Sequence, residues 1–276
     1  MIYGLIGYPV SHSLSPIMHN AAFSQLKINA EYKLFPLKVQ ELEPFLKNLK
    51  NNNIFGLNVT VPYKEKVIPF LGKLSDEAKL IGAVNTIKVT DSGLEGFNTD
   101  AEGFLKHLTQ GLKFNPQGKK IAIIGAGGAS RAVSVRLSQT RPKAISIYDL
   151  EENKLKALVE HLKKNFKDIE IKEAHSVEEL NIGGVSLLIN ATPIGMKEAD
   201  PCLVEEKLLH QNLLAYDLIY KPKETKLLNL AKKNGAKVSN GLGMLLYQGM
   251  LSFEIWTGQR APKEIMQKAL EEVFNA

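Results

Sequence analysis

The chain has 276 residues, which exceeds a usual single domain and fits two domains that could enclose a ligand cleft. Hydrophobic residues make up 44% and charged residues 23% of the sequence, which are ordinary globular levels and argue against a disordered chain. The formal net charge of +6 comes from scattered lysines. This pattern predicts a solvated surface and suits small anionic ligands, and it does not favour nucleic acid.

The apolar segment Met1–Pro9 has no basic head and is interrupted by Gly and Pro well before membrane-spanning length. We therefore expect a buried strand and no membrane association. Cys202 is the only cysteine, so an internal disulfide is impossible, and no group of Cys and His has metal-site spacing. These features predict a cytoplasmic protein without a bound metal.

Along the chain, short runs rich in Val, Ile and Leu alternate with segments of helical period. The runs are Gly4–Gly7, Ile54–Val61, Ile121–Gly125, Ile145–Asp149 and Leu187–Asn190. Strands that alternate with helices along the chain predict an α/β fold, with parallel sheets covered on both faces.

Interruptions of this pattern predict the domain organisation. Turn and charged residues fill Asn115–Lys120, so we place a junction near residues 101–118, and a second break falls at Ser239–Gly243. From Met244 onward the apolar residues fit one face of a helix, which we expect to pack on the first domain. The expected domains are residues 1–103 plus 241–276, and residues 104–240 as a Rossmann-like, doubly wound dinucleotide-binding domain.

The segment Asn58–Lys64 predicts the end of a strand that leads into a helix opened by Pro62. Asn58 and Thr60 are two residues apart and so share one face of the strand. Lys64 follows at the carboxyl end, where parallel sheets collect ligands. The alternative is a capped turn with a surface lysine.

Two further polar residues, Asn85 and Asp100, each follow or end a short predicted strand. Such positions suit ligand binding, but either residue could instead cap a helix.

Small residues follow the apolar run Ile121–Ile124 and precede a segment that can continue as a helix; they are Gly125, Ala126, Gly127, Gly128 and Ala129. Glycines in a turn between strand and helix let backbone N–H groups approach a pyrophosphate at the positive end of the helix dipole. This context predicts a dinucleotide site.

Asp149 ends the next predicted strand, 24 positions after Gly125. A carboxylate near this place binds the adenosine ribose and repels the extra phosphate of NADP, so it favours NAD. Lys154 and Lys156 are the nearby cations that could reach such a phosphate, by folding back over the helix start. The alternative role of Asp149 is a helix N-cap, and both roles could coexist.

The chain resembles the shikimate dehydrogenases along nearly its full length. The matching segments, in order, are Ser13–Pro16, Asn58–Lys64, Gly82–Thr86, Asn98–Asp100, Gly125–Ala129, Asn190–Pro193 and Gly241–Gln248. The resemblance implies reversible reduction of 3-dehydroshikimate to shikimate in aromatic amino acid biosynthesis, with NAD or NADP as cofactor.

The resemblance also implies roles for individual residues. Lys64 and Asp100 would be the catalytic pair beside the reacting hydroxyl. Shikimate would be surrounded by Ser13, Ser15, Thr60, Asn85, Asp100, Tyr220 and Gln248. The nicotinamide region would be lined by Asn190, Thr192, Leu218 and Gly241, with Asp76 near the cofactor. We expect the small anionic substrate as the partner, and a monomer or homodimer.

The chain departs from the family at Asp149, Leu150 and Glu151, where the usual NADP-binding segment carries asparagine, arginine and threonine. The departure is similar to NAD-using shikimate and quinate dehydrogenases of the same superfamily, so quinate stays open as a substrate. An alternative of another class is a non-catalytic, nucleotide-responsive binding protein, against which the presence of both Lys64 and Asp100 weighs. A methylenetetrahydrofolate dehydrogenase would not require Ser13 and Ser15, which we expect on one face of an extended segment before Pro16.

Overall fold

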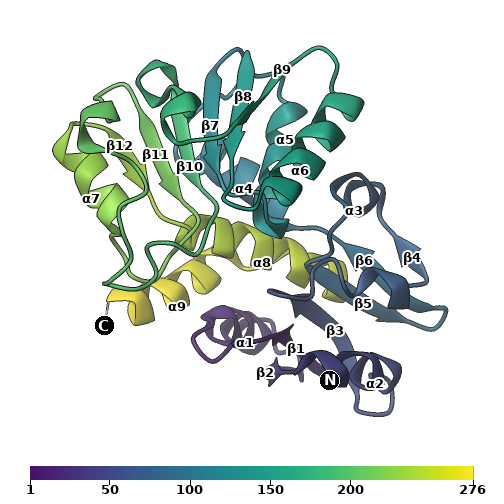
Figure 1. The fold of residues 1–276 in the computed structure, drawn as a ribbon. Coiled ribbons are helices and arrows are strands. Elements are labelled where there is room, and N and C mark those ends of the chain that lie inside the picture. Colours follow the sequence, from purple (N-terminus) through teal and green to yellow (C-terminus); the bar gives the residue numbers. More distant parts are fainter. Residues whose placement is uncertain (276) are drawn as a thin grey trace. The chain divides into compact units, whose positions relative to one another are not determined.

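A computed structural model describes residues 1–275 and divides the chain into two compact units. The first unit comprises Met1–Phe104 together with the chain from Leu245 onward, and the second comprises Leu105–Met244. Each is described below by itself (Figure 1). Among the described residues, no helix combines the length and the apolar character needed to cross a membrane.

The first unit is built on a six-stranded sheet of order β2-β1-β3-β5-β6-β4. The strands are β1 (Ile2–Gly7), β2 (Glu31–Pro36), β3 (Ile54–Val59), β4 (Lys73–Leu74), β5 (Thr86–Thr90) and β6 (Gly93–Phe97). Strands β2, β1 and β3 are parallel, but β5 runs antiparallel to both β3 and β6. The sheet is therefore mixed, and the short Asp91–Ser92 turn between β5 and β6 permits only a hairpin there.

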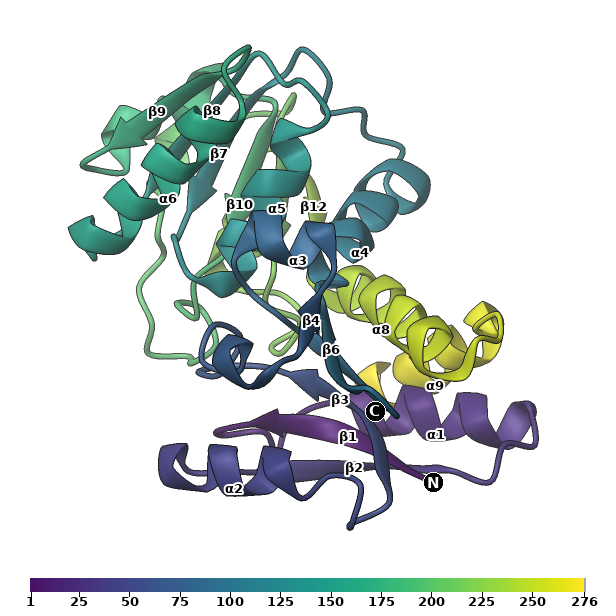
Figure 2. The ribbon, with the colours of Figure 1, turned by 90° about the vertical axis from the view of Figure 1, so that its right-hand side faces the viewer.

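Helices cover both faces of strands β1 to β3, with α1 and α2 on opposite sides (Figure 1). The helices that contribute to this unit are α1 (Ser15–Gln25), α2 (Leu42–Lys47), α3 (Asp76–Ile81), α4 (Asp100–Lys106), α8 (Leu242–Thr257) and α9 (Lys263–Asn275). On the α2 side, Leu42 and Leu46 pack in one core with Ile6 and Val59. Figures 1 and 2 both show α9 beside α1.

Aromatic side chains bury the other face of these strands. The Tyr3 ring stacks on Phe23 with centroids 5.2 Å apart, and Trp256 of α8 lies 5.2 Å from Tyr3. The Trp256 indole N–H donates to the Ile87 carbonyl at 2.9 Å. A Cβ at Gly56 would stand 2.4 Å from the indole ring, so the absence of a side chain in β3 makes room for this packing.

The second unit is a parallel sheet of order β12-β11-β10-β7-β8-β9. Its strands are β7 (Lys120–Ile124), β8 (Ala144–Tyr148), β9 (Glu170–Ala174), β10 (Leu187–Asn190), β11 (Leu214–Asp217) and β12 (Lys237–Ser239). The chain winds from β7 outward through β8 and β9 on one side, and from β10 outward through β11 and β12 on the other. This is the strand order of a Rossmann fold, whose ligands bind where the direction of winding changes, at β7 and β10.

The helices wholly within the second unit are α5 (Gly128–Ser138), α6 (Glu152–Asn165) and α7 (Lys226–Lys233). Shorter helical segments of the chain are Val39–Glu41, Ile68–Phe70, His107–Gly111, Glu178–Leu180, Ile182–Gly184 and Glu206–Leu208. In the core, Ala122, Leu188 and Ala215 pack against Leu227 and Ala231 of α7. Figure 1 shows α7 beside β11 and β12.

The structure confirms each apolar run as a strand and confirms the helix predicted after the second break. It also confirms the opening strand, β1. The α/β fold expected from alternating strands and helices is present.

Candidate active site

The predicted catalytic residues are in contact. Lys64 Nζ lies 2.5 Å from Asp100 Oδ2, and the side chains are 15% and 8% exposed. Lys64 follows β3 and Asp100 is the first residue of α4 after β6, so separate strand ends bring the two together. A nearly buried ammonium and carboxylate at this distance can share and move a proton at a ligand beside them.

The prediction that Pro62 opens a helix is wrong. The Val61–Pro62 peptide bond is cis, and residues 61–67 form turns. The turns are fixed by burial, because Tyr63 is inserted in the core and its hydroxyl donates to the Leu37 carbonyl at 2.6 Å. The Lys64 carbonyl then accepts from Val84 N at 2.7 Å, which holds the backbone of the lysine in place.

Asp100 is not the cap of α4. The Asn98 side chain caps the helix instead, since its Oδ1 accepts from Asp100 N at 3.1 Å and from Ala101 N at 3.4 Å. Asn98 Nδ2 donates to the Ala83 carbonyl at 2.9 Å, which ties the start of α4 to the segment before β5. The Asp100 carboxylate is therefore available to Lys64.

Asn85 precedes β5, contrary to the expectation that it follows or ends a strand, and it does not cap a helix. Its Oδ1 accepts from Thr99 N at 2.7 Å and from the Thr86 hydroxyl at 3.0 Å. Its Nδ2 donates to the Thr99 hydroxyl at 2.9 Å and faces Gln248 Oε1 at 3.4 Å. The structure thus joins two of the implied substrate residues, Asn85 and Gln248, in one buried group.

Asn58, Thr86, Ser252 and Tyr32 extend this group. Asn58 Nδ2 lies within hydrogen-bond distance of the hydroxyls of Thr86 and Ser252, at 3.2 and 3.0 Å, and its Oδ1 accepts from Tyr32 at 2.8 Å. The available sequence signals were the asparagine within an apolar strand and a serine four residues after Gln248, on the same face of the predicted helix.

Ser13 and Ser15 do not lie on an extended segment, because Ser15 is already the first residue of α1. Ser13 Oγ accepts from Ser15 N at 3.2 Å and lies 3.1 Å from Ser15 Oγ. The serine side chains are nevertheless adjacent, since Ser13 turns back over the helix start. Pro16 fits the first turn of α1, where its missing N–H costs no hydrogen bond within the helix.

Thr60, Asp76 and Tyr220 are the remaining implied substrate and cofactor residues. Thr60 comes directly after β3, and its N–H donates to the Ile6 carbonyl at 2.9 Å. Asp76 begins α3, is fully exposed and pairs with Lys79 at 3.1 Å. In the second unit, Tyr220 follows β11 and is half-buried.

The glycine turn lies between β7 and α5, as predicted. Gly125 has φ +110°, and a Cβ there would stand 2.9 Å from the Ala191 carbonyl oxygen, so only glycine fits. At Gly127, no described heavy atom lies within 4 Å of where a Cβ would be. This open space adjoins the first turn of α5, whose N–H groups have no acceptor within the helix. The turn therefore fits a pyrophosphate.

Asp149 follows β8 and points back at this turn. Its Oδ2 accepts from Ala126 N at 2.5 Å, and its Oδ1 accepts from Glu151 N at 2.7 Å. The N-cap of α6 is Glu151, so Asp149 supports the start of the helix without being its cap. Lys154 is held at 2.6 Å by Glu151, and Leu150 is 82% exposed.

Asn190 ends β10 and orders the loop that follows it. Its Oδ1 accepts from Thr192 N at 3.0 Å and from the Thr192 hydroxyl at 2.7 Å. Its carbonyl accepts from Leu218 N at 2.9 Å. At Gly241 a Cβ would stand 2.0 Å from the Leu218 carbonyl oxygen. The four implied nicotinamide residues are therefore gathered beside the carboxyl ends of β10 and β11.

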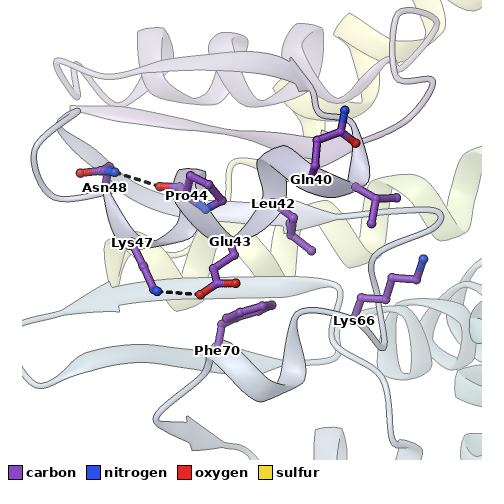
Figure 3. A pocket seen from close by; sticks show the side chains of 9 residues that line it. Gln40, Leu42, Glu43, Pro44, Lys47, Asn48, Lys66 and Phe70 are labelled. Atoms are coloured by element: carbon purple, nitrogen blue, oxygen red, sulfur yellow. Dashed lines mark hydrogen bonds and ion pairs between the residues drawn. The ribbon is translucent and has the colours of Figure 1, made fainter.

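A surface groove of about 620 Å³ lies around α2 (Figure 3). It is lined by Val39, Gln40, Leu42, Glu43, Pro44, Lys47, Asn48, Lys66 and Phe70. Lys47 pairs with Glu43 at 2.6 Å, and Asn48 donates to the Pro44 carbonyl. No predicted site residue is among these lining residues.

Known proteins resemble the chain from end to end. Residues 5–87 match the shikimate dehydrogenase substrate binding domain, and residues 241–271 match the shikimate 5'-dehydrogenase C-terminal domain. The shikimate dehydrogenase (NADP(+)) of Methanopyrus kandleri is 44% identical over 275 residues, which are 98% of this chain and 95% of that protein. The chain belongs to the shikimate dehydrogenase family.

Solved structures of family members agree in fold. The shikimate 5-dehydrogenase of Listeria monocytogenes, in complex with shikimate and NAD, is 35% identical with a TM-score of 0.89, covering 98% of this chain and 96% of its own. The quinate dehydrogenase of Corynebacterium glutamicum, in complex with NAD, is 27% identical with the same TM-score, covering 99% of each chain.

Proposed function

We propose that the protein is a shikimate dehydrogenase that reversibly reduces 3-dehydroshikimate to shikimate with a nicotinamide dinucleotide. The observation that carries the proposal is the 2.5 Å contact between Lys64 Nζ and Asp100 Oδ2, nearly buried at the carboxyl ends of two strands. Family membership supplies the substrate, since close relatives are named for shikimate.

Lys64 and Asp100 perform the proton chemistry. In the reducing direction, charged Lys64 gives its proton to the oxygen that becomes a hydroxyl, and in the oxidising direction it takes that proton back. Asp100 accepts hydrogen bonds from the ammonium and from the hydroxyl, which fixes the reacting oxygen against Nζ. The dinucleotide supplies or accepts the hydride.

The first unit supplies the substrate site in this proposal, and the second supplies the dinucleotide site. Asn85 and Gln248 are held together in a buried group, which suits recognition of ring hydroxyls. Ser13 and Ser15 are neutral donors for the substrate carboxylate. Gly125 to Ala129 and Asp149 hold the pyrophosphate and the adenosine ribose, and Asn190, Thr192, Leu218 and Gly241 hold the nicotinamide end.

We propose further that NAD is used at least as well as NADP. The Asp149 carboxylate is fixed beside the glycine turn by Ala126 N and Glu151 N, so it stands where a ribose diol is recognised. A phosphate on that ribose would be repelled by this carboxylate, and the neighbouring Leu150 offers no positive charge to bind it. Lys154, a nearby lysine that could otherwise bind the phosphate, forms an ion pair with Glu151.

The test is an absorbance assay at the reduced-nicotinamide band, with shikimate and quinate each against NAD and NADP. We expect turnover of shikimate, and an efficiency with NAD equal to or above that with NADP. Turnover of quinate alone would assign the chain to the quinate dehydrogenases, which the resemblance to the Corynebacterium glutamicum enzyme allows. Binding of NAD without turnover of either acid would favour a nucleotide-responsive binding protein.

A further inference from the structure

We propose that Asp217 is a positioning residue for the nicotinamide end of the cofactor. It is the last residue of β11, is fully buried and was not among the residues that the sequence singled out. The inference rests on the proposed function, because it assigns a task to a residue behind the dinucleotide site.

The Asp217 carboxylate receives hydrogen bonds from three segments of the second unit. Asn190 Nδ2, at the end of β10, donates to Oδ1 at 3.0 Å, and Ile219 N donates to the same oxygen at 3.0 Å. The Thr225 hydroxyl donates to Oδ2 at 2.7 Å. Thr225 is itself the N-cap of α7, with Leu228 N directed at its hydroxyl. One side chain thus joins two strand ends and a helix start.

Two of the residues held by Asp217, Asn190 and Ile219, order a neighbour in the implied nicotinamide region. Asn190 Nδ2 donates to Asp217 and to the Ile194 carbonyl, both at 3.0 Å, which directs its Oδ1 at Thr192 N and the Thr192 hydroxyl. Ile219 is fixed through its N–H, and its carbonyl accepts from Gly241 N at 3.0 Å. Without the carboxylate, the Asn190 amide would keep only its hydrogen bond to the Ile194 carbonyl, and the loops after β10 and β11 would lose their common anchor.

The three donors around Asp217 require a hydrogen-bond acceptor at the position of its side chain. Burial raises the pKa of Asp217, while the hydrogen bonds from Thr225, Ile219 and Asn190 oppose that rise. An asparagine could keep the geometry, because its oxygen can accept from Asn190 and Ile219 while its amide donates to the Thr225 oxygen. An alanine removes all three interactions.

The test separates the two halves of the dinucleotide by calorimetry. The probes are NAD and ADP-ribose, or NADP and 2'-phospho-ADP-ribose if the wild-type protein prefers NADP. For Asp217→Ala we expect the Kd of the dinucleotide to rise at least tenfold and the Kd of the ribose analogue to stay within twofold. Asp217→Asn should restore dinucleotide binding to within about threefold of wild type.

Thr225→Val provides a second variant if Asp217→Ala fails to fold. It removes the hydrogen bond to Asp217 and the cap on Leu228 N, and it should weaken dinucleotide binding selectively, by a smaller factor than Asp217→Ala. Thr140→Val is the matched control, since that hydroxyl donates to the Leu137 carbonyl, near the end of α5.

Equal weakening of both probes, no weakening of either, or failure of Asp217→Asn to rescue would overturn the inference. These outcomes leave the proposed function intact, because they concern variants only. Failure of the wild-type protein to bind NAD and NADP would instead remove the proposed function itself.

Discussion

At the residue scale, the candidate site depends on how two carboxylates, those of Asp100 and Asp149, bond at the starts of helices. Asp100 stands at the first position of a helix, where a carboxylate often acts as a cap, but Asn98 caps α4 and leaves Asp100 to Lys64. Asp149 instead uses both of its oxygens, because Oδ1 accepts from Glu151 N at the start of α6 while Oδ2 is directed at the glycine turn.

Replacing Lys64 with alanine should lower kcat at least a hundredfold with little change in the KM for shikimate, because general acid–base groups contribute on that order. Steady-state kinetics measure both constants. Lys66→Ala is the control, since Lys66 is an exposed lysine on the same loop. Near-normal turnover in a folded Lys64→Ala variant would remove Lys64 from the mechanism.

Asp100→Asn should also be severely impaired, and here we expect KM to rise more than in Lys64→Ala. The amide keeps the shape of the side chain but loses the charge that holds the ammonium and accepts from the substrate hydroxyl. Kinetics beside Asp91→Asn, an exposed aspartate of the same unit, test this. An unchanged KM and rate would show that Asp100 has only a structural part.

Cofactor preference should respond to Asp149 and Leu150. The double exchange Asp149→Asn with Leu150→Arg should raise the efficiency ratio of NADP to NAD at least tenfold, a gap worth about 1.4 kcal/mol, since it removes a repelling charge and adds a phosphate partner. Lys154→Ala serves as the comparison and should leave the ratio nearly unchanged. A preference for NADP in the wild type that Lys154→Ala abolishes would mean that Lys154 binds the phosphate.

The placement of candidate site residues was predictable from sequence only where a short motif carries them. Lys64, Asp100, the glycine turn and Asp149 each stand in a recognisable local context. Ser252 and Asp217 do not, because their importance comes from partners that are distant in sequence: Asn58 lies 194 positions from Ser252, and Asn190 lies 27 from Asp217.

At the element scale, the strands were predictable because buried parallel strands are continuous apolar runs. The turns after Pro62 were not, since burial of Tyr63 overrides the local preference for a helix start. The prediction of an extended segment at Ser13 and Ser15 was wrong for a related reason. Helix α1 begins one residue before Pro16, and periodicity does not locate helix ends to that accuracy.

Packing of β3 against α8 leads to a prediction about Gly56. Gly56→Ala should lower the free energy of unfolding by roughly 1–3 kcal/mol, because the new methyl would meet the rigid Trp256 indole. Denaturant unfolding measures this. Gly72→Ala is the control, since the nearest atom to its Cβ would be 3.8 Å away, at ordinary contact distance. Equal stability of Gly56→Ala and wild type would show that the indole can shift aside.

At the scale of the whole molecule, one buried histidine ties stability to pH. His19 is fully buried, its ring stacks on Tyr32 with centroids 4.5 Å apart, and among the described residues neither ring nitrogen has a hydrogen-bond partner. Burial lowers the pKa of His19 to about 3. The folded state therefore binds fewer protons than the unfolded state between that value and the ordinary value near 6.5.

Stability from this source is complete above the unfolded pKa and is lost as the pH falls. Between pH 7.5 and 5 we expect a loss of about 2 kcal/mol in the free energy of unfolding. Urea unfolding at several pH values should show that His19→Leu removes this part of the pH dependence. His12→Gln, at an exposed position, should leave it unchanged. Identical pH profiles for His19→Leu and wild type would contradict the assignment.

The discontinuous first unit has a consequence for synthesis on the ribosome. The second unit is one uninterrupted stretch, Leu105–Met244, and can fold as soon as it emerges. Strands β1 to β6 emerge earlier but lack Trp256 and Ser252, which cover their aromatic face and complete the Asn58 group only after α8 has been made. The part of the chain that is translated first is therefore the part that finishes folding last, and until then its apolar strands depend on chaperones or on partial collapse for protection.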